Sequence, residues 1–230
     1  MIYFSVSDVL ERSWELTKRY GIVLVIVYFV LYLIQYFVGN LFTPAIDVDA
    51  LQSALENQDF NAIMKLYYSN PTGMIVSTIL SAVIMLGFIN CLLQLAKGTA
   101  NEVAIDHWKL DINVYVKYVV IAIVVKVLTT IGYCCCIIPG LYIDARLKFA
   151  AVRAIDCPED DIMGCIKASW NMTSGNVMNL IFLVLAEIAI VIIGILVCCV
   201  GYLPAAVIVS FADVVAYLVL SGYYNQKVEE

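Results

Sequence analysis

Residues 9–27 read VLERSWELTKRYGIVLVIV, and residues 165–185 read CIKASWNMTSGNVMNLIFLVL. Both stretches contain the pattern Ser-Trp-x-x-Thr, at 13–17 and again at 169–173, and in both a glycine then leads into a long apolar run. A pattern that recurs with the same sequel indicates an internal repeat. The repeated unit is predicted to be a short amphipathic helix, a glycine and a membrane span.

The composition excludes a soluble fold. Of the 230 residues, 63% are hydrophobic and only 14% are charged, and the mean hydropathy is +0.93, whereas soluble domains are about half apolar. At about 20 apolar residues per span, the chain suits five or six helices in one bundle. The net charge of -6, without a cluster of Lys and Arg, argues against nucleic acid as a partner. The single histidine, His107, argues against a multi-histidine metal site and is expected at the surface.

Six apolar stretches are candidates for membrane spans. They lie at about 22–42, 74–96, 113–137, 141–155, 177–200 and 203–222. The fourth stretch is short and carries four charged side chains between Asp144 and Arg153, so it must face protein, water or the interface rather than lipid. An amphipathic helix is expected at 5–20, and the polar segment 43–73 is expected to contain a second surface helix.

The distribution of Lys and Arg predicts the orientation. If both ends are cytoplasmic, Lys65 is the only Lys or Arg residue in the predicted outer loops. Six spans with cytoplasmic N- and C-termini is therefore the preferred topology, and it places both motif copies on the cytoplasmic face. If the fourth stretch does not span, five spans result and the second copy lies outside. The whole chain is expected to be one integral membrane domain, with repeat-like units at about 5–97 and 157–222 and a linking hairpin at about 112–156.

The second half of the chain carries several short motifs. They are Pro139-Gly140-Leu141-Tyr142, Arg146-Leu147-x-Phe149, and Ala168-Ser169-Trp170 followed by Gly175. In these motifs the chain resembles a widespread family of bacterial multi-span proteins whose members include the membrane domain of glycerophosphodiester phosphodiesterases. The likeness is best over about 90–222, and it implies an all-α polytopic helix bundle in the bacterial cytoplasmic (inner) membrane. The chain has no room for the phosphodiesterase barrel, so the resemblance does not imply that enzymatic activity.

Three ionisable residues lie near the middle of predicted spans: Lys126, Glu187 and Asp213. An ionised side chain is costly in hydrocarbon, so each should face the interior and find a partner. We expect Lys126 to pair with Glu187 or Asp213. Such a site relays a proton, binds an ion or binds a polar head group. The alternative is a structural polar clasp that fixes the register of the helices.

Four further residues are candidates for contact with lipid head groups. They are Arg146, Lys148, Trp14 and Trp170. The planar guanidinium of Arg146 matches phosphate geometry, and tryptophan prefers the head-group level of a bilayer. The alternative for the two basic residues is local charge compensation, because Asp144 lies four residues before Lys148 on the same predicted helix.

The eight cysteines raise the question of disulfides or a metal site. Cys134-Cys135-Cys136 and Cys198-Cys199 end two of the predicted spans, near the outer face in the preferred topology, where disulfides can form. No Cys-x-x-Cys spacing is present and no histidine or aspartate flanks the clusters. We therefore expect these residues to pack helix ends as small side chains, with disulfides as the alternative and no metal.

The leading functional hypothesis is a non-enzymatic integral membrane protein that binds lipid or a membrane partner and acts in envelope homeostasis, assembly or immunity. It rests on the short loops and on the lack of a nucleophile–base arrangement in the sequence. The alternative is a small proton-coupled transporter or permease that uses Lys126, Glu187 and Asp213. Membrane lipids are the expected partners, with a membrane protein or a second copy of the chain as further candidates, and no cofactor is expected.

Overall fold

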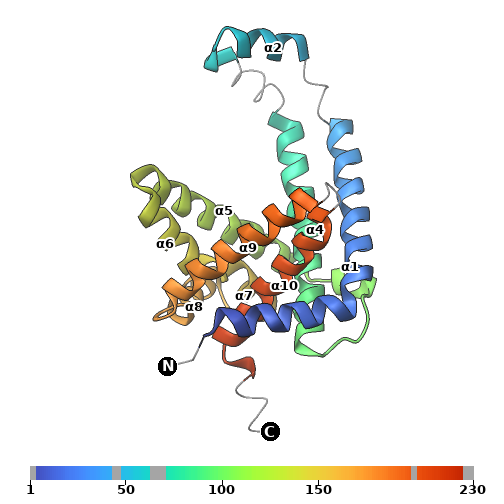
Figure 1. Cartoon of the computed structure of the whole chain (residues 1–230), viewed down its shortest axis with the longest axis vertical. Helices are drawn as coiled ribbons and strands as arrows, with labels where there is room; N and C mark the ends of the chain where they lie inside the picture. The colour runs from blue at the N-terminus through green and yellow to red at the C-terminus, as the bar shows by residue number, and fades with distance from the viewer. Residues whose placement is uncertain (1–3, 43–47, 63–70, 198–200, 225–230) are drawn as a thin grey trace. The chain divides into compact units, whose positions relative to one another are not determined.

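The computed structural model describes residues 4–42, 48–62, 71–197 and 201–224, and all the regular elements in these ranges are helices. The elements are α1 (Val6–Phe42), α2 (Val48–Glu56), α4 (Pro71–Lys97), η1 (Ile105–Trp108), α5 (Ile112–Cys135), α6 (Ile137–Leu147), α7 (Ala150–Asp156), α8 (Ile162–Met172), α9 (Val177–Val197) and α10 (Tyr202–Leu220). Figure 1 shows the course of the chain through them. The all-α class predicted from the sequence is confirmed.

The chain divides into two compact units. Unit 1 contains Met1–Tyr28 and Met85–Glu230, and unit 2 contains Phe29–Ile84. Within unit 2, the side-chain amide of Gln35 on α1 donates a hydrogen bond to the hydroxyl of Ser81 on α4. Every candidate site residue named from the sequence lies in unit 1.

Five helices among the described residues are long and apolar enough to cross a membrane. Their spanning segments are Val6–Val38, Ile79–Lys97, Ile112–Cys134, Val177–Leu196 and Tyr202–Leu220. They agree with an integral membrane protein. On α9 the side chains of Ile188, Ile192 and Leu196 are all exposed, as expected for a face in contact with lipid.

The prediction that 141–155 forms a fourth span is not confirmed, because no single helix of spanning length covers it. This stretch contains the end of α6 and most of α7, which are helices of 11 and 7 residues, whereas a span needs about 20. The chain leaves helical geometry between them at Phe149, where φ is -98° and ψ is 0°. With five spans, the two motif copies are expected on opposite sides of the membrane, and the argument for two cytoplasmic termini no longer holds.

The two motif copies differ in how the glycine is used. In the second copy α8 ends at Met172, Gly175 adopts a positive φ of 84°, and α9 begins two residues later. A positive φ favours glycine and stops a helix. In the first copy Gly21 lies inside α1, which continues from the amphipathic segment into the span. The expected surface helix at 5–20 is therefore not separated from the span by a break in helical secondary structure, and its position at the membrane surface stays a prediction.

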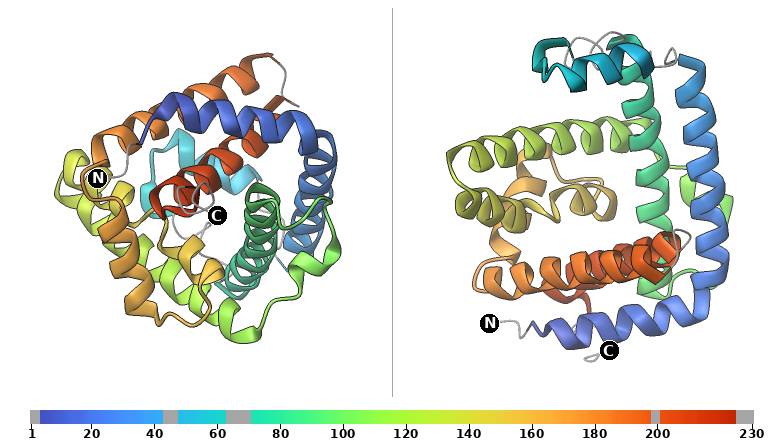
Figure 2. Two further views of the ribbon diagram at one scale, coloured as in Figure 1. Left: turned by 90° about the horizontal axis from the view of Figure 1, so that it is seen from below. Right: turned by 45° about the horizontal axis from the view of Figure 1, so that its top comes forward.

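Two helical hairpins depend on contact between glycines. Figure 2 shows the chain doubling back from α5 to α6, and there a Cβ on Gly132 would lie 2.9 Å from the Cα of Gly140. A Cβ on Gly201, at the start of α10, would lie 2.3 Å from the carbonyl oxygen of Gly194 on α9. The break between α5 and α6 is at Cys136, slightly earlier than predicted, and Pro139 lies in the first turn of α6. A proline is tolerated in the first turn because its missing N–H would have no helical partner.

The core of unit 1 is centred on α10. Figure 1 shows α10 beside α9 as an antiparallel pair, and the aromatic ring of Tyr217 on α10 lies 6.2 Å from that of Phe149, centroid to centroid. The buried side chains of α10 are Ala205, Val207, Phe211, Ala212, Val214, Val215, Ala216, Tyr217, Leu218 and Leu220. A helix that is apolar and buried on most sides fixes the position of any polar side chain it carries. Asp213 is such a side chain.

The short helix η1 packs against α4, and this contact buries His107. The side-chain amide of Asn90 donates to the backbone carbonyl of His107 over 2.7 Å. A Cβ on Gly87 would lie 2.0 Å from the Trp108 ring, so the tryptophan occupies the space that this glycine leaves open. The expectation that His107 lies at the surface is therefore wrong, because only 9% of the residue is exposed.

The glycine contact between α9 and α10 gives a prediction for stability. Gly201→Ala puts a Cβ against the backbone of Gly194, and overpacking of this kind costs about 1–3 kcal/mol. The control is Gly21→Ala, whose Cβ would meet only the Thr17 methyl group at 3.0 Å and which gains from the higher helix propensity of alanine. Thermal unfolding in detergent should show a lower midpoint for Gly201→Ala and not for Gly21→Ala. Equal midpoints for the two variants would contradict the hairpin contact.

Candidate functional site

A lysine and two carboxylates from three segments meet inside unit 1. Lys148 follows α6, Glu187 lies near the middle of α9, and Asp213 lies on α10. The Nζ atom of Lys148 donates to Oε2 of Glu187 over 2.7 Å and lies 2.6 Å from Oδ1 of Asp213. The side chain of Glu187 is 8% exposed and that of Lys148 is 17% exposed. We call these three residues the ion-pair triad.

The structure changes one member of the site predicted from the sequence. Lys126 was expected to pair with Glu187 or Asp213, but both carboxylates contact Lys148 instead. Lys126 lies on α5 with an exposed side chain and takes part in none of the ion pairs found in the described ranges. The reason is that α6 is a short helix that packs on both α5 and α9, which brings its C-terminal end to the carboxylates.

The alternative interpretation, in which Asp144 neutralises the charge of Lys148, is not what the structure shows. Both of the ion pairs formed by Lys148 are with residues on other helices. Asp144 is partly buried, like Asp213, so burial alone does not decide between them, and the Lys148 ammonium lies beside the carboxylates of α9 and α10. Lys148 thus joins the end of α6 to α9 and α10.

The triad is not balanced in charge. One ammonium group faces two carboxylates, so the three groups together carry one negative charge when all are ionised. Oε1 of Glu187 is buried and accepts no hydrogen bond from the residues that the structure describes, whereas Oδ1 of Asp213 forms the 2.6 Å ion pair with Lys148. Buried polar atoms without partners are costly, and they often mark a functional site.

Next to the triad lies a cavity of about 340 Å³. It is lined by Ala122, Val125, Lys126, Thr129, Thr130, Tyr133, Asp144, Leu147, Lys148 and Ala151, which belong to α5, α6, α7 and the junction after α6. Lys126 therefore shares this cavity with Lys148, whereas Glu187 and Asp213 are not among the lining residues. The charged groups of the lining are two lysines and one aspartate, with three hydroxyl groups beside them.

The second copy of the Ser-Trp-x-x-Thr motif holds Arg146. The hydroxyl of Ser169 donates to the backbone carbonyl of Arg146 over 2.9 Å, and Nη1 of Arg146 donates to the hydroxyl of Thr173 over 3.4 Å. The guanidinium carbon lies 4.3 Å from the centroid of the Trp170 ring and 5.8 Å from that of Tyr142. All three defining residues of the motif thus contact one arginine, which is only 6% exposed and whose Nε has no hydrogen-bond partner within the described part of the chain.

The four candidates for head-group contact therefore lie in different settings. Arg146 and Trp170 contact each other, Lys148 belongs to the triad, and Trp14 is 51% exposed on α1. The first motif copy is bonded within its own helix, because Ser13 donates to Val9 and Thr17 donates to Ser13. Contact with lipid stays a prediction for all four.

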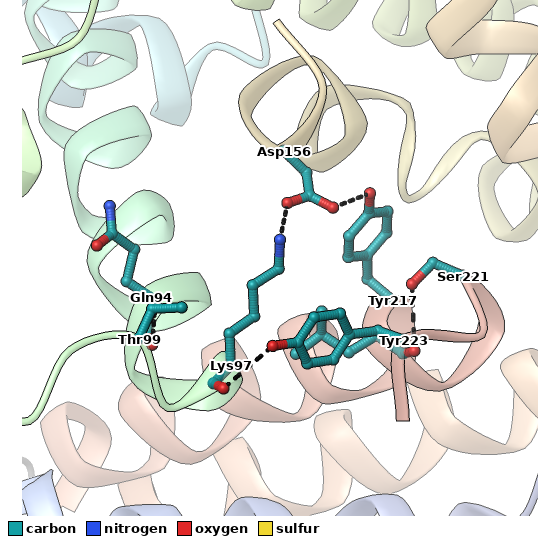
Figure 3. A network of polar contacts seen from close by, with 8 residues as sticks. Gln94, Lys97, Thr99, Asp156, Tyr217, Ser221 and Tyr223 are labelled. Carbon is teal, nitrogen blue, oxygen red and sulfur yellow. Dashed lines mark hydrogen bonds and ion pairs between the residues drawn. The ribbon is translucent and has the colours of Figure 1, made fainter. Parts of the chain in front are cut away.

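A further polar network was not expected from the sequence. Figure 3 shows Lys97 of α4 paired with the carboxylate of Asp156, whose other oxygen accepts a 2.8 Å hydrogen bond from the hydroxyl of Tyr217. The hydroxyl of Tyr223 donates to the backbone carbonyl of Lys97 over 3.2 Å. The network joins the C-terminal ends of α4, α7 and α10. Nothing in the spacing of these residues distinguishes them from ordinary charged residues at helix ends.

Among the cysteines whose side chains the structure describes, five are free thiols. They are Cys91, Cys134, Cys136, Cys157 and Cys165. Burial raises the pKa of the Cys165 thiol and of the Cys157 thiol above the usual value, which lowers their reactivity at neutral pH. Cys198 and Cys199 lie outside the described residues, so the disulfide alternative is not tested for that pair.

Comparison with known proteins gives no relative: no family model, curated protein or solved structure matches the chain. The resemblance to the bacterial multi-span family stays a prediction.

The identity of the lysine in the triad gives a second prediction. Lys148→Met leaves the buried Glu187 and the partly exposed Asp213 without a cation, and breaking a buried pair costs roughly 3 kcal/mol or more. Lys126→Met is the matched control, because it removes the same charge from an exposed side chain. Thermal unfolding in detergent should show a large loss for Lys148→Met and little for Lys126→Met. The assignment is wrong if the Lys126 variant loses as much stability as the Lys148 variant.

Proposed function

We propose that this is a non-enzymatic integral membrane protein that binds the phosphate head group of an anionic lipid in the cavity beside the triad. The observation that carries the proposal is that Lys126 and Lys148 line the same cavity. Lys148 is already paired with Glu187 and Asp213, whereas Lys126 takes part in none of the ion pairs among the described residues, so the Lys126 ammonium is the charge that the cavity offers to an anion. A phosphodiester head group is the anionic component of a membrane that this ammonium can bind.

The rest of the lining suits the same ligand. The hydroxyl groups of Thr129, Thr130 and Tyr133 are hydrogen-bond donors and acceptors for phosphate and glycerol oxygens. Ala122 and Val125 add apolar surface, and Ile123 and Val127 on the same helix are exposed, so acyl chains have an apolar face to lie against. A polar cavity bordered by apolar helix surface favours a lipid over a small soluble anion.

Lipid binding is better supported than the transporter alternative. That alternative requires Lys126, Glu187 and Asp213 to converge on one polar cavity. Lys126 lines the cavity, but the two carboxylates contact Lys148 and do not line it. A bacterial cytoplasmic membrane, a role in envelope homeostasis, assembly or immunity, and a second protein partner or copy are parts of the proposal that rest on sequence alone.

Removal of the free lysine tests the proposal. Lys126→Gln deletes a cavity charge that takes part in no ion pair among the described residues, and a charged hydrogen bond contributes about 1.5–3 kcal/mol. The amount of phosphatidylglycerol retained through purification, measured by native mass spectrometry, should fall roughly ten-fold. Phosphatidylcholine, which has no net charge, should bind weakly to both proteins.

The matched control is Lys167→Gln, which removes the same charge from an exposed position on α8. Retained phosphatidylglycerol should be unchanged in this variant. If the two variants retain the lipid equally, the cavity is not the binding site.

A further inference from the structure

Lys148 belongs to two polar environments at once. Its side chain lines the cavity, and its ammonium group pairs with Glu187 and Asp213. It lies at the junction between α6 and α7, with 17% of its side chain exposed. A lysine side chain has four rotatable bonds and carries its charge at the end, so it can change partner without movement of the backbone.

The carboxylates depend on this one cation. The charged groups that act on Glu187 are Asp213 from α10 and Lys148 from the end of α6. Lys126 and Asp144 are on the cavity side of Lys148, on α5 and α6. If the ammonium moves toward a ligand in the cavity, the buried Glu187 and the partly exposed Asp213 lose the cation that lies between them. Two like charges this close in low dielectric are unfavourable, and binding of a proton to one of them removes the repulsion.

We infer that Lys148 couples lipid binding to proton uptake: the bound phosphate takes the ammonium from Glu187 and Asp213, and a proton from solvent then binds to one of these carboxylates. The inference rests on the proposed function, since it needs the anionic head group in the cavity. Lys148 stays protonated throughout. One O–H bond forms, no covalent bond breaks, and the anion enters together with one proton, so the net charge of the site is unchanged.

Thermodynamic reciprocity sets the sign of the pH dependence. If the bound lipid favours protonation of the carboxylates, protons must favour the bound lipid to the same extent. The affinity for the lipid therefore rises as the pH falls, by at most about ten-fold per pH unit for one proton. If Lys148 bound the phosphate without leaving its carboxylates, lipid binding would not be linked to proton uptake by Glu187 or Asp213, and the affinity for the lipid would not depend on the pH through these groups.

Calorimetric titration with a soluble short-chain phosphatidylglycerol tests the coupling. The full-length protein in detergent is titrated at one pH in two buffers that differ in ionisation enthalpy, and the difference in heat reports the protons taken up per bound lipid. We expect net uptake for the wild type. We expect reduced uptake for Glu187→Gln, and no change for Glu102→Gln, the same substitution at an exposed loop residue.

A second variant keeps the test decisive if Glu187→Gln folds poorly. In Glu187→Gln/Asp213→Asn neither carboxylate of the triad competes for Lys148, so the lipid should bind roughly five-fold tighter or more without proton uptake. Lipid binding with equal heats in both buffers would overturn the coupling and leave the proposed function intact. If the wild type does not bind the lipid at all, the proposed function fails and the coupling fails with it.

Discussion

The cost of a charge in a membrane is the constraint on which the rest of this structure depends. Glu187 and Asp213 lie on the two most C-terminal of the candidate spanning helices among the described residues, both of which are strongly apolar. Neither carboxylate is tolerable there as an isolated ion. Lys148 meets both, and for this the chain must bring a charged helix end into the interior of unit 1. The interruption between α6 and α7 is thus the feature that allows α9 and α10 to carry acidic residues.

The Ser-Trp-x-x-Thr motif supports the same arrangement through a different neighbour of α6. Its second copy fixes the backbone and the guanidinium of Arg146, two residues before Lys148. One short helix is therefore held by α8 through Arg146 and by α9 and α10 through Lys148. The recurrence of the motif indicated a role in architecture, and in the structure the second copy positions the segment that carries the basic residues.

The sequence was sufficient to predict the features that depend on composition and on the length of apolar stretches. Long apolar stretches predicted the all-α class and the positions of the five candidate spanning helices. The position of Glu187 and Asp213 near the middle of predicted spans indicated that each needs a partner inside the protein. It was not sufficient where an interaction depends on how a short helix folds back. Pro139 and Gly140 predicted a break, but not that the next helix would be too short to span. Lys126 was therefore expected to be the partner of the carboxylates, because it lies near the middle of a predicted span. The different roles of Gly21 and Gly175 also depend on tertiary contacts. A glycine ends a helix only where such contacts favour a positive φ, and Gly21 lies inside α1.

The central claim is that Lys148 is the counter-ion of the two intramembrane carboxylates. Solid-state NMR on the protein in bilayers, with ¹⁵N in the lysine side chains and ¹³C in the glutamate carboxyl groups, measures this contact directly through dipolar dephasing. Glu187 should show strong dephasing, given the 2.7 Å contact between Nζ and Oε2, and the signal should persist in Lys126→Gln and disappear in Lys148→Gln. Dephasing that disappears in Lys126→Gln and persists in Lys148→Gln would contradict the claim.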